Sequence, residues 1–131
     1  SANNGSAGYE LWQSDGTISG TVQIKDIHSG PTGSLPQSFT LLPDGRLVFA
    51  AADHTFGMEL WQTDGTPSGT RLLLDLALGY ANSNPADFLV MGNQLYFVAD
   101  NGITGRELWS LPVDGLQPPT FLDLYLPQVQ R

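Results

Sequence analysis

The segment Gly8-Tyr-Glu-Leu-Trp-Gln-Ser-Asp-Gly-Thr17 decides the fold, because the chain repeats it. It returns as Gly57-Met-Glu-Leu-Trp-Gln-Thr-Asp-Gly-Thr66, and in shorter form as Gly105-Arg-Glu-Leu-Trp109, which gives a period of 49 and then 48 residues. A repeat of this length is too long for a leucine-rich or ankyrin unit and is close to a four-stranded propeller blade. Such a unit cannot bury its own faces, so the fold must come from copies stacked on one another.

The match extends well beyond this signature. Residues 8–34 overlay residues 57–83 without a gap, with 14 identities in 27 positions. With one residue deleted at a turn, later positions match too: Pro36 with Pro85, Phe39 with Phe88, Leu47 with Leu95, Phe49 with Phe97, and Ala51 with Ala99. A tandem repeat is therefore predicted over most of the chain.

One repeat contains four short runs of strand character. We expect strands at 38–42, 46–52, 58–63 and 70–76, joined by turns that carry Gly and Asp. Asp44-Gly45 between two apolar runs is a strong hairpin signal. The run at 46–52 is apolar on both faces, which suits a sheet packed between two others. No segment has capped helical periodicity, so almost no helix is expected.

The fold class predicted is all-β, a propeller-like array of four-stranded antiparallel blades with about two and a half repeats. Two extra residues in Ser110–Asp114, together with Pro118, Pro119 and Pro127, indicate that the array ends in a cap. The predicted divisions are a disordered or linker segment at 1–7, a half repeat (strands three and four) at 8–34, a full repeat at 35–83, a terminal capping repeat at 84–126 and a tail at 127–131.

Composition excludes several classes of function. Thirteen acidic and five basic side chains give a net charge of −8, which repels nucleic acid. No cysteine is present, so neither disulfides nor thiolate sites are expected. No apolar run reaches the ~18 residues of a membrane span. Because residue 1 is Ser rather than Met, a processed product or a fragment is expected.

The signature resembles that of a known family. Glu-Leu-Trp-x-x-Asp-Gly-Thr, at Glu10–Thr17 and Glu59–Thr66 and in part at Glu107–Trp109, is similar to the ELWxxDGT repeat proteins, which occur in tandem in large exported bacterial proteins. The resemblance covers about residues 8–125. It implies a β-propeller-like array at the cell surface or outside the cell, with no assigned enzyme activity and no catalytic residues to carry over.

The recurring acids invite a chemical interpretation. Glu10, Glu59 and Glu107 share a strand face with Trp12, Trp61 and Trp109. Asp26, Asp75 and Asp123 lie among apolar neighbours of the fourth strand. Thr hydroxyls, backbone N–H groups of the Asp-Gly turn or indole N–H groups could pair with such acids. A structural role is favoured, because the carboxylate pair of a glycoside hydrolase would occur once per protein rather than once per unit.

Metal binding is the second chemical reading. Calcium is the alternative cofactor, because Asp15, Asp64, Asp53, Asp100 and Asn101 supply oxygen ligands near Gly turns. No segment matches an EF-hand or a Gly-rich calcium repeat, so turn formation is favoured and no metal is assigned. His28 and His54 are too few for a zinc site and are expected in loops or at the surface.

The aromatic side chains raise carbohydrate binding as an alternative function. Trp12, Trp61 and Trp109 could stack on sugars, but their position inside strands favours the core between blades. Tyr9, Phe56 and Tyr80 lie beside turns and are the candidates for ligand contact.

The sequence thus predicts a non-enzymatic extracellular or cell-surface module with a structural or protein-interaction role. Its expected partners are other copies of itself or the missing part of a larger protein, in a ring or fibre, because two and a half blades cannot close a ring. A carbohydrate-binding propeller lectin, with glycan sites at blade junctions, is the alternative.

Overall fold

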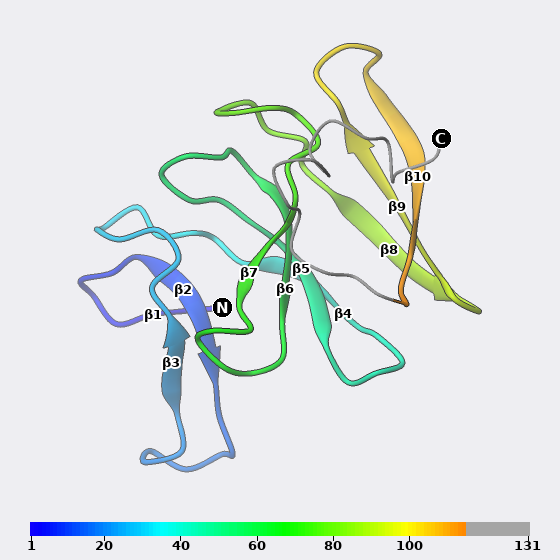
Figure 1. The fold of residues 1–131 in the computed structure, drawn as a ribbon. Helices are drawn as coiled ribbons and strands as arrows, with labels where there is room; N and C mark the ends of the chain where they lie inside the picture. Colours follow the sequence, from blue (N-terminus) through cyan, green and yellow to red (C-terminus); the bar gives the residue numbers. More distant parts are fainter. Residues whose placement is uncertain (115–131) are drawn as a thin grey trace.

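The computed structural model describes residues 1–114, and in this part of the chain all regular structure is β (Figure 1). Its strands form three antiparallel sheets. The first sheet has β1 (Ala2–Asn3), β2 (Tyr9–Gln13) and β3 (Val22–Lys25). The middle sheet has β4 (Gln37–Leu41), β5 (Leu47–Ala51), β6 (Glu59–Thr63) and β7 (Arg71–Leu74). The third sheet has β8 (Ala86–Met91), β9 (Gln94–Asp100) and β10 (Arg106–Pro112).

Within each sheet, consecutive strands are neighbours, as short Gly-containing turns dictate. The turn between β4 and β5 is an example. Gly45 has φ +89°, Leu42 N–H donates to the carbonyl of Arg46 at 2.8 Å, and Asp44 accepts from Arg46 N–H at 3.1 Å. Positive φ is accessible to Gly without steric cost, which is why the Asp-Gly pair closes this hairpin.

The three sheets follow one another across the molecule, and a core lies on each face of the middle sheet (Figure 1). The first core, against the first sheet, contains Leu11, Ile27, Phe49, Ala51 and Trp61. The second core, against the third sheet, contains Leu42, Val48, Leu60, Leu73, Leu95, Phe97, Ala99, Trp109, Leu111 and Val113. Successive residues of β5 are buried because their side chains alternate between the two cores.

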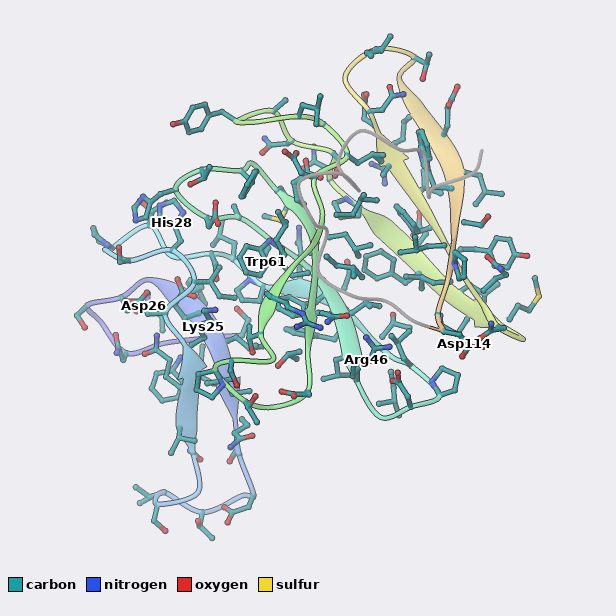
Figure 2. The ribbon with its side chains drawn as sticks, viewed as in Figure 1. Lys25, Asp26, His28, Arg46, Trp61 and Asp114 are labelled. Carbon is teal, nitrogen blue, oxygen red and sulfur yellow. The ribbon has the colours of Figure 1, made fainter. Side chains whose placement is uncertain are left out.

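Long basic side chains also connect neighbouring sheets. Lys25 Nζ on β3 donates to the carbonyl of Thr70 at 2.7 Å, joining the first and middle sheets. Arg46 donates to Gln62 Oε1 at 2.8 Å and to the carbonyl of Val113 at 3.3 Å, joining the middle and third sheets. Figure 2 labels both basic side chains.

The first sheet differs from the expected division of the chain. Residues 1–7, expected to be disordered or a linker, contain β1 and a turn in which Asn4 Oδ1 accepts three hydrogen bonds. Ala2 pairs with Glu10 as Ala51 pairs with Glu59, so β1 occupies the place of Ala51, the last residue of β5, and of the residue after it. Only the middle sheet has four strands within residues 1–114; the predicted strand around Asp123 and the tail at 127–131 lie outside the described residues.

Candidate functional site

Glu10 of the first signature is fully buried and is held by backbone and hydroxyl donors. Its Oε2 accepts from Ile27 N–H at 2.9 Å and Ser34 Oγ at 2.6 Å, and its Oε1 accepts from His28 N–H at 3.0 Å and Ser34 N–H at 2.9 Å. These donors lie at both ends of the connection from β3 to the middle sheet. The carboxylate therefore fixes the path of the chain from one sheet to the next.

Glu59 does the same one period later. It accepts from Leu76 N–H at 2.9 Å, Ser83 N–H at 2.8 Å and Ser83 Oγ at 2.6 Å. Burial raises the pKa of Glu59 from 4.5 to about 7, although these hydrogen bonds act in the opposite direction. Backbone N–H groups and a serine hydroxyl thus take the role that the sequence suggested for Thr, turn or indole groups. Glu107, the glutamate of the third signature, lies on β10 and is half-buried.

The two Asp-Gly-Thr turns are matched in detail. Asp15 Oδ1 accepts from Thr17 N–H at 2.9 Å and Thr17 Oγ1 at 2.7 Å, and Asp64 Oδ1 accepts from the same groups of Thr66 at 2.9 and 2.6 Å. The Thr hydroxyls hold the pKa of both aspartates below the ordinary range. Both carboxylates therefore accept hydrogen bonds within their own turns, as aspartate side chains commonly do.

The other candidate oxygen ligands also bond to local backbone. Asp53 Oδ1 accepts from Thr55 and Phe56 N–H, both at 2.7 Å. Asp100 and Asn101 accept from N–H groups two residues onward. Within residues 1–114 no three His, Cys, Asp or Glu side chains are grouped as metal ligands.

The aspartates that follow the fourth strands differ from one another. Asp75 is buried, accepts from Gly79 N–H at 3.1 Å, and has a pKa raised by burial. Asp26 is exposed instead of lying among apolar neighbours, because β3 ends at Lys25 and Asp26 begins the loop. Asp123 lies outside the described residues.

The signature tryptophans occupy three environments. Trp61 belongs to the first core and Trp109 to the second, where Trp109 Nε1 donates to the carbonyl of Ala99 at 3.0 Å. Trp12, which has no sheet before it within the described residues, is only half-buried. Figure 2 labels Trp61 at the middle of the molecule.

The candidate ligand aromatics lie in separate elements, although the loops of Phe56 and Tyr80 adjoin through a hydrogen bond from Gly57 N–H to the carbonyl of Gly79 at 3.1 Å. Tyr9 begins β2, Phe56 lies in the loop before β6, and Tyr80 lies in the connection to the third sheet with 82% of its surface exposed. A cavity of about 410 Å³ between the first and middle sheets is lined by none of the three.

The two histidines form a contact that the sequence did not predict. The rings of His28 and His54 have centroids 4.0 Å apart, and His54 Nε2 is 2.9 Å from Ser29 Oγ. Both residues lie in loops where the first and middle sheets meet, and Figure 2 labels His28 there. The contact is confined to this junction, because the matching residues of the next one are Ala77 and Gly102.

Sequence reasoning missed an apolar surface on the third sheet. Leu108 of β10 is 60% exposed, whereas the matching Leu60 and Leu11 are 1% and 3% exposed. The strand register places Leu89 and Met91 of β8, both exposed, on the same face. We call these three residues the outer face of the third sheet. The repeat period could have identified it, because within residues 1–114 no further sheet packs on the face of β10 that carries Leu108.

No protein-family model, curated protein or solved structure matches the chain. The resemblance to ELWxxDGT repeat proteins therefore depends on the signature residues alone. Residues 1–114 include no helix with the length and apolar character needed to cross a membrane.

Proposed function

We propose that the chain is a non-enzymatic structural or protein-interaction module, and that its sheets are blades of an open, propeller-like array. The observation that carries the proposal is the exposure of Leu108 at a position where the preceding sheets bury leucine. An exposed, contiguous apolar surface is a common mark of a protein-binding site.

The outer face of the third sheet defines what a partner would meet. Leu89, Met91 and Leu108 lie on three-stranded sheet surface, and the middle sheet shows how such a surface is covered: another sheet packs onto it. We infer that the partner presents a comparable sheet. Other copies of the chain, or a larger protein that contains it, can supply one.

Contact between unlike ends of two copies is a heterologous interface, which generates a ring if the rotation closes and a fibre if it does not. Within the chain, the face of the middle sheet that carries Leu60 packs against the face of the third sheet that carries Trp109, so the matching contact between copies would join unlike faces. A ring or an open fibre is therefore the form of assembly we propose.

The alternatives have less support from the geometry. Burial of Trp61 and Trp109 gives sugar stacking at these residues no support, and Trp12 is half-buried. Glu10 and Glu59 use their carboxylate oxygens to hold the chain between sheets, which suits a scaffold better than a catalytic acid. We further propose an extracellular or cell-surface location, supported by the resemblance to exported proteins. Recovery of the parent protein only from the cytoplasmic fraction of its cells would contradict that location.

A thiol placed on the outer face tests the docking role directly. The chain has no cysteine, so Leu108→Cys carries a single thiol, and Ile103→Cys is the matched control in a loop residue that is 87% exposed. We expect the reaction of the Leu108→Cys thiol with a bulky maleimide to slow at least ~10-fold between dilute and concentrated protein, as association covers it. The control rate should not change. Equal rates for the Leu108→Cys variant at all concentrations would contradict the proposal.

A further inference from the structure

The two histidines of the chain meet where the first and middle sheets join. His28 lies in the connection after β3, and His54 lies in the loop between β5 and β6. Their ring centroids are 4.0 Å apart and the ring planes are inclined by 43°. The sequence has no other histidine and no cysteine. The two sheets therefore bring every imidazole of the chain to one place.

The backbone beside each ring is anchored. His28 N–H donates to the buried Glu10 carboxylate at 3.0 Å. Asp53, the residue before His54, accepts from two N–H groups of its own loop, both at 2.7 Å. The two imidazoles are therefore held close together by the fold, and little rearrangement is needed for both to contact one ligand.

Both rings keep a nitrogen for a ligand. His54 Nε2 is 2.9 Å from Ser29 Oγ, and where this nitrogen carries the proton and donates, His54 Nδ1 keeps its lone pair. A ligating histidine commonly donates its other ring N–H in this way. His28 Nδ1 is buried and has no hydrogen-bond partner among the described residues. Such an atom is costly, and contact with a cation offsets the cost.

The imidazole pair is not part of the repeated scaffold. The matching residues where the middle and third sheets meet are Ala77 and Gly102. That junction keeps the hydrogen bonds that Ser83 donates to Glu59. A junction of this type therefore forms without imidazoles, so packing alone does not account for the pair.

We propose that His28 and His54 bind one divalent transition-metal ion, such as Zn²⁺, at the junction of the first and middle sheets. Imidazole nitrogen suits Zn²⁺, Ni²⁺ and Cu²⁺, whereas Ca²⁺ and Mg²⁺ take oxygen ligands. His54 is exposed, so the ion can enter from solvent. The net charge of −8, which includes Asp26 two residues before His28, favours a cation (Figure 2).

Two imidazoles are fewer than the three or four protein ligands of most zinc sites, so water completes the coordination and the ion stays exchangeable. Because the ligands come from two sheets, the bound ion links them and stabilises the folded chain. This inference does not depend on the proposed docking role, which concerns the third sheet.

A zinc titration of the unmodified chain tests the site. By isothermal titration calorimetry we expect one Zn²⁺ per chain, with saturation below ~1 mM. Excess Ca²⁺ should not displace the Zn²⁺, because Ca²⁺ prefers oxygen ligands. Saturating Zn²⁺ should raise the melting temperature.

Two variants and a matched control locate the ion. His54→Ala and His28→Ala should each weaken Zn²⁺ binding at least ~10-fold, because the chelate requires both imidazoles. Thr55→Ala, at the exposed neighbour of His54, should leave the affinity unchanged. The melting temperature of His54→Ala should not respond to Zn²⁺. If His28→Ala fails to fold, as circular dichroism would reveal, His54→Ala decides the question alone.

Four results would overturn the proposal and leave a stacking contact only. They are no saturation by ~1 mM Zn²⁺, unchanged affinity in His54→Ala, an equal loss of affinity in Thr55→Ala, and a melting temperature that does not respond to Zn²⁺. Displacement of Zn²⁺ by Ca²⁺ would also refute it, because it would indicate that carboxylates rather than imidazoles hold the ion.

Discussion

At the scale of single residues, the signature carboxylates hold one sheet to the next. Glu10 and Glu59 each accept bonds from the end of one sheet and from a serine 24 residues further along the chain. Buried carboxylates require such partners, and backbone N–H groups of a connecting segment need acceptors in turn. The same carboxylate therefore accepts hydrogen bonds from the N–H groups of the connecting loop and fixes the direction of that loop.

The raised pKa of Glu59 gives a pH-dependent prediction. Because the pKa is about 7 in the folded chain and its ordinary value is 4.5, folding favours the protonated acid. Its stabilising contribution is full below about pH 4.5 and is lost as the pH rises through 7, a change of about 3 kcal/mol by linkage. Glu59→Gln, which does not titrate, should flatten this slope, with a smaller slope of the same sign left by Asp75. Free energies of unfolding at pH 5 to 8 test this; an unchanged slope would contradict it.

Truncation of a signature tryptophan tests the first core. Trp61→Ala removes a side chain that is 5% exposed, and a loss of ~3–5 kcal/mol is expected for an aromatic of this size. Trp12→Ala is the matched control and should cost clearly less, because Trp12 is half-buried. Denaturant midpoints of both variants give the comparison. A loss under ~1 kcal/mol for Trp61→Ala would place its side chain outside the core.

At the scale of elements, the turn after each signature depends on close packing. Both Gly20 and Gly69 lie against the carboxylate of the aspartate five residues earlier, and a Cβ at either position would overlap it. The same carboxylates accept the bonds that close the Asp-Gly-Thr turns. A Cβ here would have to move the carboxylate away from its turn donors, so Gly is favoured by proximity rather than by its φ angle.

Gly69→Ala should displace Asp64 and weaken the connection between β6 and β7. We expect a lower melting temperature, because the added methyl group forces the Asp64 carboxylate away from the Thr66 donors that close the turn. Ser68→Ala, at the exposed neighbouring residue, should change stability by less than ~0.5 kcal/mol. Thermal unfolding of both variants measures the difference. Equal melting temperatures would show that the turn accommodates the methyl group.

Much of the middle sheet could be predicted from the sequence, because periodicity and Asp-Gly turns are local signals. The strands expected at 38–42, 46–52, 58–63 and 70–76 correspond to β4 to β7 within two residues at each boundary. The strand β1 was missed because Ala2-Asn3 has little strand propensity and is recognised only by its place beside β2. The partners of Glu10 and Glu59 were missed because they are set by the tertiary path of the connections. Matching serines 24 residues after each Glu were the available signal.

At the scale of the whole molecule, the middle sheet has four strands within residues 1–114, and the first and third sheets have three each. The middle sheet has a core on each face, whereas Leu108 on the third sheet and the edge of β2 on the first remain uncovered within the described residues. In stacked repeat proteins, much of the stability comes from interfaces between neighbours. We therefore expect the first and third sheets to associate with other protein surfaces in solution.

The mass of the unmodified chain in solution tests this central claim most directly. Sedimentation equilibrium from ~1 µM to ~1 mM spans the affinities expected of exposed docking surfaces. The account predicts an average mass above the 14.1 kDa of one chain that rises with concentration as copies associate through their ends. A constant mass of 14.1 kDa over the whole range would contradict it.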